Sequence, residues 1–214
     1  LGLVNRGIKP IFCVGTKHNM GVNRLMEFIV NNAPAPNEIP AAATEDDKEI
    51  PCDPSGPVSA FVFKTSIESH LGEMSFFKLY SGEITEGTDL INSNSDTKER
   101  LSQMFAIAGK NRQKLDKVVA GDIAAAVKLK GTNTNSTLNG PKNTDTKIKP
   151  IEYPEPKYRL AVKAKSSTDD EKLGVVLSEL HKIDQTLLME YSKELKQILL
   201  YGQGELHLNI AKWH

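Results

Sequence analysis

The sequence has little cysteine, no surplus of either charge and no long apolar run, and each shortage excludes a class of protein. Its 214 residues include two cysteines, Cys13 and Cys52, which are too few for a disulfide framework or a metal-binding set. Lys plus Arg and Asp plus Glu number 27 each, so net charge gives no overall attraction to nucleic acid. No apolar run approaches the ~20 residues that a membrane-spanning helix needs. We therefore expect no membrane association, and RNA binding only through local basic clusters.

The chain also lacks the motifs of nucleotide chemistry. It has neither a Gly-rich phosphate loop ending in Lys and Ser or Thr, nor an Asn-Lys-x-Asp motif. Phosphoryl transfer requires such a cradle together with Mg²⁺, so we expect no nucleotide hydrolysis by this chain alone. The first residue is Leu1, and a helical pattern continues to the last residues, which indicates a fragment of a longer protein. No signal peptide precedes the first strand, so a cytoplasmic location is expected.

Residues 61–130 predict a small β-barrel. Short runs of alternating apolar and polar residues are interrupted by Gly, Asn and Asp, as is typical of strands joined by tight turns. Gly82 and Gly87 stand where a turn requires positive φ. Closure into a barrel would remove the exposed strand edges. The basic residues at 110–117 are expected in a polar stretch between two strands, and residues 131–149 are expected to be mostly loop.

Residues 1–36 predict the last β-α unit of an α/β domain. We expect a helix end at 1–6, a buried parallel strand at 8–14, a polar loop at 15–21 and a helix from Val22. Ligands of such sheets lie beyond the carboxyl ends of strands, so the loop is either a ligand loop or an ordinary connection. Residues 37–56, rich in Pro, Ala and acidic residues, predict an extended linker. The barrel domain then covers residues 57–150.

Residues 151–214 predict an α+β domain. A strand is expected at 158–162, a helix capped by Thr168 with Glu171 at the capping-box position, two strands at 187–191 and 195–201, and a second helix from Glu205. This order gives five of the six elements of a ferredoxin-like fold. The predicted fold class is therefore multi-domain, with a β-barrel and a ferredoxin-like α+β domain after the end of an α/β domain.

No catalytic constellation stands out against ordinary structural roles. Asp169, Asp170 and Glu171 could suggest a metal site, but the first turn of a helix favours acidic residues through its dipole. His70 and His207 are expected in a turn and in packing rather than as bases, because no Ser or Cys nucleophile arrangement accompanies them.

Short sequence motifs, spread over nearly the full length of the chain, resemble those of elongation factor G, the bacterial translational GTPase. They keep that family's order and spacing, and they include Tyr80-Ser81-Gly82, Lys98-Glu99-Arg100, Ala120-Gly121-Asp122, Tyr153-Pro154-Glu155-Pro156 and Gly202-Gln203-Gly204-Glu205-Leu206-His207-Leu208. The resemblance implies the end of the GTPase domain at residues 1–36, domain II as the barrel and most of domain III at the C-terminus. The Glu-Leu-His-Leu motif also occurs in related ribosomal GTPases.

The resemblance also implies a cofactor, partners and contact residues. The parent would bind GTP with Mg²⁺, and Gly15 and Thr16 would be the remnant of the guanine loop, where Val14-Gly15-Thr16 replaces the usual Gly-Ser-Ala. A monomer is expected, its barrel contacting small-subunit ribosomal RNA and its third domain facing a small-subunit ribosomal protein. The expected RNA contacts, which could instead be solvated barrel surface, are Lys64, His70, Lys78, Arg100 and Arg112.

Three hypotheses about function remain open at the level of the sequence. The first is a translocation factor, whose GTP hydrolysis moves transfer RNA and messenger RNA on the ribosome while these residues dock and couple domains. The second is a ribosome-binding paralogue with weak or no GTPase activity, supported by the Val14-Gly15-Thr16 departure. The third is a barrel-based interaction protein unrelated to ribosomes.

Overall fold

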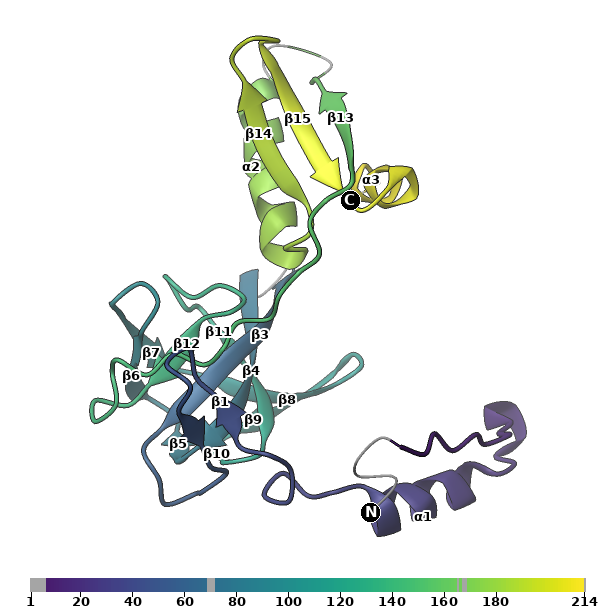
Figure 1. Cartoon of the computed structure of the whole chain (residues 1–214), viewed down its shortest axis with the longest axis vertical. Helices are drawn as coiled ribbons and strands as arrows, with labels where there is room; N and C mark the ends of the chain where they lie inside the picture. Colours follow the sequence, from purple (N-terminus) through teal and green to yellow (C-terminus); the bar gives the residue numbers. More distant parts are fainter. Residues whose placement is uncertain (1–6, 69–71, 165, 167–168, 214) are drawn as a thin grey trace. The chain divides into compact units, whose positions relative to one another are not determined.

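Residues 1–41 form one unit of the chain, separate from residues 42–214. The computed structural model describes residues 7–68, 72–164, 166 and 169–213. The first unit contains the 3₁₀ turn η1 (Thr16–His18) and the helix α1 (Val22–Asn32), drawn in purple in Figure 1. The predicted helix from Val22 is confirmed, and the predicted helix end at 1–6 lies outside the described residues.

The strand predicted at residues 8–14 is wrong, because these residues have no regular secondary structure. A parallel strand is stabilised by hydrogen bonds to neighbours on both sides, and the unit contains no strand to provide them among its described residues. Ile11 is accordingly 93% exposed, and no residue of α1 is buried. Residues 8–14 thus have the composition of a buried strand, but this unit offers no neighbouring strand with which they could pair among its described residues.

The second unit begins with a barrel. Its strands are β1 (Ala42–Ala43), β2 (Glu49–Ile50), β3 (Ser59–Glu68), β4 (Gly72–Ser81), β5 (Glu83–Thr85), β6 (Thr88–Asn92), β7 (Thr97–Leu101), β8 (Met104–Ala108), β9 (Asn111–Leu115), β10 (Lys117–Val119), β11 (Ile123–Val127) and β12 (Thr137–Asn139). Eight of them pair in the order β7-β6-β12-β3-β4-β11-β8-β9, every contact antiparallel. The strands β5 and β10 pair separately.

The sheet curls around a main apolar core, which confirms the predicted barrel, and a smaller apolar cluster contains Met74, Ala125 and Val127. Leu101 of β7 and Met104 of β8 come from strands far apart in the pairing order, yet both are fully buried in the same cluster. Phe77 and Leu79 of β4 are also fully buried in it. Because side chains alternate along a strand, their neighbours in sequence point to the outside of the barrel.

Two segments differ from the prediction. The stretch at 111–115 is itself the strand β9, rather than a link between strands. Its first four residues are polar and exposed, so its pattern lacks the apolar alternation that marks a strand. Within the predicted loop at 131–149, Thr137–Asn139 forms the strand β12 in the middle of the sheet, between β6 and β3. Three residues are too few to show a period.

Part of the predicted linker also pairs. The strands β1 and β2 form a short hairpin, the amide of Glu45 donates to Lys147, and the amide of Lys149 donates to Ala43. Residues 42–50 therefore belong to the second unit. The turn at Gly82 has φ +82°, and a Cβ there would lie 2.7 Å from the Cα of Val58, so both backbone and space require glycine.

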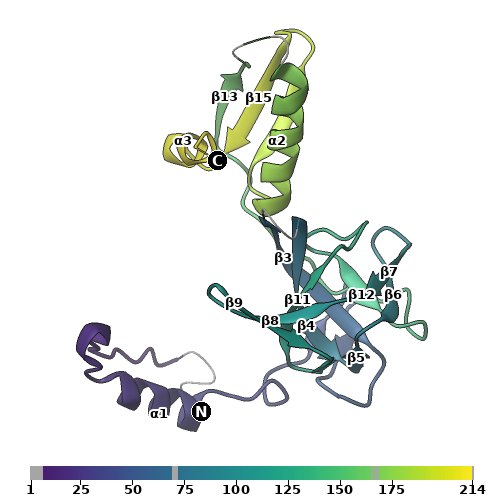
Figure 2. The same cartoon turned by 180° about the vertical axis from the view of Figure 1, so that it is seen from behind.

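The C-terminal domain has the predicted order of elements. They are β13 (Tyr158–Val162), α2 (Asp170–Ile183), β14 (Leu188–Ser192), β15 (Gln197–Gly202) and α3 (Glu205–Ala211). The strands form an antiparallel sheet in the order β13-β15-β14, and α2 lies on one face of it (Figures 1 and 2). Leu177 of α2, Leu200 of β15 and Leu208 of α3 share a core, so the predicted α+β domain is confirmed. Asp169, rather than Thr168, occupies the N-cap position of α2; Thr168 lies outside the described residues.

A buried carboxylate fixes the chain after β11. Glu99 of β7 is 3% exposed, and its side chain accepts hydrogen bonds from the amides of Lys130 (3.0 Å) and Gly131 (2.6 Å) and from the hydroxyl of Thr132 (2.9 Å). No Lys or Arg lies within ion-pair distance of this carboxylate in the described part of the chain. Backbone donors therefore compensate for its burial.

We expect Glu99→Gln to destabilise the barrel. The glutamine NH₂ group is a donor, and it would face another donor at a position where the carboxylate oxygen of Glu99 accepts a hydrogen bond. The expected loss is about 1–3 kcal/mol, the cost of leaving a buried polar group unsatisfied. Urea unfolding, with amide hydrogen exchange of Lys130 and Gly131, measures it. Glu45→Gln, at an exposed residue whose side chain has no ion pair among the described residues, is the control. Equal unfolding midpoints for the two variants would contradict the role given to Glu99.

Candidate functional site

The outer face of β3 and β4 brings lysines and aromatic rings together. Phe76, Lys78 and Tyr80 alternate with the buried Phe77 and Leu79, so all three point away from the main core. Phe76 is partly buried, because it packs against a smaller apolar cluster that contains Met74 and Ala125. A register shift between Val62 and Lys64 interrupts β3, after which Lys64 stands opposite Phe76. A β-bulge of this kind re-aims the side chains that follow it.

Each lysine of this face lies over an aromatic ring. The Nζ of Lys64 is 5.6 Å from the centroid of the Phe76 ring, and the Nζ of Lys78 is 5.0 Å from that of Tyr80. These are cation–π distances, which hold the ammonium groups in place without neutralising them. No carboxylate lies within ion-pair distance of either lysine among the described residues. We define Lys64, Phe76, Lys78 and Tyr80 as the lysine–aromatic face.

The phenol of Tyr80 completes this face. Burial raises its pKa, so the hydroxyl stays protonated at neutral pH and can donate a hydrogen bond. The described residues provide no acceptor for it. Two cations, two rings and a phenol donor on adjacent strands are the components with which proteins contact a single-stranded or looped nucleic acid.

The other predicted arginine contacts come from different strands than this face, although Arg112 reaches Glu68 at the end of β3. Arg100 lies on β7 and Arg112 on β9, the two ends of the pairing order. The Nη2 of Arg112 is 2.9 Å from a carboxylate oxygen of Glu68, whereas Arg100 is 4.0 Å from Asp89 with both side chains exposed. Arg112 is thus engaged, and Arg100 is nearly free.

His70 lies outside the described residues. Sequence reasoning found both lysines but missed Phe76 and Tyr80, although the alternation Phe76-Lys78-Tyr80 along one strand was the available signal.

The loop at Gly15 forms a tight hairpin. The amide of Gly15 donates to the carbonyl of Met20 at 2.9 Å, and the amide of Met20 donates back at 3.0 Å. The amide of Thr16 has no acceptor among the described residues. Of the two residues that the resemblance assigns to the guanine loop, Gly15 therefore already uses its amide within the loop, and the amide of Thr16 has no partner among the described residues.

No further element of a nucleotide or metal site accompanies this loop in the described part of the chain. The described residues hold no group of three His, Cys, Asp or Glu side chains arranged to bind a metal ion. Among the same residues, no helix has the length and apolar character needed to cross a bilayer.

His207 has a structural environment. Its Nδ1 accepts the amide of Gln203 at 3.0 Å, so the ring proton lies on Nε2, which donates to Asp184 at 2.9 Å. Burial raises the pKa of the Asp184 carboxyl, but donors from Thr186 and His207 outweigh it and hold that pKa below its usual value. Both ring nitrogens are occupied, so His207 ties α3 to the end of α2.

Comparisons with known proteins identify both domains of the second unit. Residues 57–140 match the family model for elongation factor G domain 2, and residues 153–214 match the model for elongation factor G, domain III. A protein from Thermus thermophilus, known from a crystal structure, is similar with a TM-score of 0.72 and 27% sequence identity. The match covers 92% of this chain and 28% of that protein.

We expect Asp184→Asn to destabilise the C-terminal domain by about 1 kcal/mol, because three charge-assisted hydrogen bonds, two from Thr186 and one from His207, are weakened. The folded pKa is lowered, so this stabilisation is present above the unfolded pKa and is lost as pH falls through the folded value. The difference between wild type and variant should therefore shrink as the solution is acidified through that range. Urea unfolding followed by circular dichroism measures it. Asp116→Asn, at an exposed residue, is the control, and a difference independent of pH would contradict the assignment.

Proposed function

Because the chain belongs to the elongation factor G family through its barrel and C-terminal domain, we propose that it is the docking body of a ribosomal translocation factor. In this proposal the longer protein binds GTP with Mg²⁺ and promotes movement of transfer RNA and messenger RNA on the ribosome in the cytoplasm. The residues present here contribute ribosome contacts and coupling between domains. The protein acts as a monomer.

The observation that supports this proposal is the lysine–aromatic face on a domain 2 barrel. Lys64 and Lys78 carry unneutralised charge on adjacent strands, and backbone phosphates dominate the affinity of proteins for nucleic acid. Two other lysines of the barrel are paired, Lys114 with Glu86 at 2.7 Å and Lys117 with Glu83 at 2.6 Å. Exposed lysines such as Lys98 and Lys110 have no ion pair among the described residues and lie over no aromatic ring. Lys64 and Lys78 differ from these lysines because each ammonium group is held over an aromatic ring, and in this proposal their face contacts small-subunit ribosomal RNA.

We expect Lys64→Ala with Lys78→Ala to weaken co-sedimentation of the chain with ribosomes. Each lost phosphate contact should reduce the slope of log affinity against log salt by roughly 0.7 to 0.9. The double variant Lys114→Ala with Lys117→Ala removes the same charge from paired positions and is the matched control. Arg100→Ala with Arg112→Ala should lie between them, since only Arg112 is firmly paired. An unchanged slope for the Lys64 and Lys78 variant would refute this choice of face.

A ribosome-docking paralogue with weak or no GTPase activity is the second candidate. It is favoured by the Gly15 amide, which donates to Met20 instead of remaining free for a guanine carbonyl. Fewer donors to the base should reduce nucleotide affinity.

Phosphate release by the full-length protein distinguishes these two candidates. A translocation factor should release phosphate from GTP in a reaction that ribosomes stimulate, whereas the paralogue should bind ribosomes with little or no stimulated release. Failure of the full-length protein to co-sediment with ribosomes at low salt would contradict both candidates and favour an interaction protein unrelated to ribosomes.

A further inference from the structure

The strand β14 forms an edge of the sheet of the C-terminal domain and pairs with no other strand than β15 among the described residues. Its sequence, Leu188-Met189-Glu190-Tyr191-Ser192, contains no Lys and no Pro, and it pairs with β15 in an unbroken register. Edge strands usually carry such residues or a bulge, which prevent pairing with another chain. Leu188, Met189 and Tyr191 are nevertheless 41%, 44% and 60% exposed.

Other sheet edges of the chain do carry protection. The end strands β7 and β9 of the barrel sheet contain two or more charged residues each: Lys98, Glu99 and Arg100 in the first, Arg112 and Lys114 in the second. The opposite edge of the C-terminal sheet, β13, contains Arg159. The strand β14 likewise contains one charged residue, Glu190, so this edge is acidic where the β13 edge is basic.

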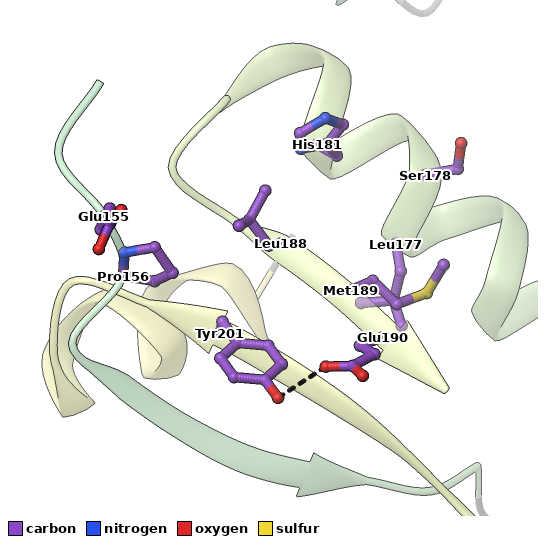
Figure 3. Close-up of a pocket in the computed structure, with 9 residues that line it drawn as sticks. All are labelled: Glu155, Pro156, Leu177, Ser178, His181, Leu188, Met189, Glu190 and Tyr201. Carbon is purple, nitrogen blue, oxygen red and sulfur yellow. Dashed lines mark hydrogen bonds between the residues drawn. The ribbon is translucent and has the colours of Figure 1, made fainter. Parts of the chain in front are cut away.

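A cavity of about 660 Å³ follows this edge (Figure 3). Its lining comes from both sides of the strand: Leu177, Ser178 and His181 of α2 on one side, Tyr201 of β15 on the other, with Leu188, Met189 and Glu190 between them. Glu155 and Pro156 close one end. The space thus lies where a further strand would be placed, with side chains of an added strand reaching both walls.

The segment that closes the cavity is fixed to the domain. The side-chain amide of Gln203 donates to the carbonyls of Pro154 (2.9 Å) and Glu155 (3.3 Å), and the amide of Lys157 donates to Gly202 (3.0 Å). The backbone of Glu155 therefore has a defined position beside the edge.

The polar groups of the cavity are mainly acceptors. Glu190 accepts the Tyr201 hydroxyl at 2.9 Å and retains a second carboxylate oxygen, while Glu155 has no ion-pair partner among the described residues. The Nδ1 of His181 donates to the carbonyl of Leu187 at 2.7 Å, so the neutral ring has its Nε2 lone pair free. Two carboxylates repel phosphate groups and attract cationic side chains.

We propose that the edge of β14 binds an extended basic segment of a partner protein by strand addition. Backbone hydrogen bonds to β14 provide the binding energy, Lys or Arg side chains contact Glu155 and Glu190, and alternate apolar side chains pack on Leu188 and Met189. The inference rests on the proposed function and deepens it, because it names the strand edge and the chemistry of the protein segment that the C-terminal domain binds; it does not involve the lysine–aromatic face.

The test uses the 214-residue chain and a synthetic ten-residue peptide of alternating lysine and valine. We expect saturable binding by calorimetry and amide shifts in the NMR spectrum centred on residues 188–192. N-methylation of alternate backbone amides keeps the side chains of this peptide but removes the N–H donors along one of its edges. The methylated peptide should therefore not bind. A peptide with glutamate in place of lysine should bind far more weakly.

Variants of the chain test the role of charge. Glu155→Gln with Glu190→Gln should weaken binding roughly two- to fivefold for each carboxylate, as exposed ion pairs do. Glu152→Gln with Glu194→Gln removes the same charge outside the cavity and should leave affinity unchanged. Leu188→Lys adds the kind of protection that other edges carry and should abolish binding, with circular dichroism confirming that the domain remains folded.

Three results would overturn the proposal. They are equal binding of the N-methylated peptide, equal effects of the two double variants, and shifts confined to the barrel. Self-association of the chain through β14 that excludes the peptide would also overturn it, in favour of a second copy as the occupant. Ribosome co-sedimentation of the Lys64 and Lys78 variant is a separate measurement, so either proposal can fail without the other.

Discussion

The short strands of the barrel close around a main apolar core. This closure determines which side chains lie on the outer surface of the barrel. Phe77 and Leu79 have no exposed surface, and a slip of one residue in β4 would move them to the outside. The same alternation fixes Phe76, Lys78 and Tyr80 on the outer face. The position of the lysine charge is thus a consequence of core packing, and only the bulge before Lys64 adjusts it locally.

Buried polar side chains form hydrogen bonds with the loop backbone groups that the short strands leave unpaired. Glu99 holds the chain after β11 through backbone donors, and Asn139 of β12 joins the Ser93 hydroxyl (2.7 Å) to the carbonyl of Thr146 (2.6 Å). Each buried donor or acceptor left unmatched would cost about 1–3 kcal/mol, so these side chains specify the path of the loops as firmly as apolar contacts specify the core. The Asn- and Thr-rich composition of residues 131–149 has this structural purpose.

The sequence predicted those elements that carry their own period or turn residues. The strand β4, the helix α1 and the order of the C-terminal domain all follow from such local patterns. It failed where structure depends on distant partners: β12 is specified by β6 and β3, and the apolar run at 8–14 finds no neighbour among the described residues of its unit. At the candidate site, Lys64 and Lys78 could be predicted as RNA contacts from their residue type. The ion pair of Arg112 with Glu68 could not be predicted, because the two residues are 44 positions apart in the sequence and no local pattern connects them.

The two candidate surfaces differ in sign and therefore select different classes of ligand. On the barrel, ammonium groups over Phe76 and Tyr80 favour phosphate and base contacts, while along β14 the carboxylates of Glu155 and Glu190 disfavour them. Balanced net charge permits this division, because 27 basic and 27 acidic residues create no overall field that would draw RNA to both surfaces. A ribosome presents RNA and basic protein together, and a docking body with one surface for each would orient itself by charge before any close contact forms.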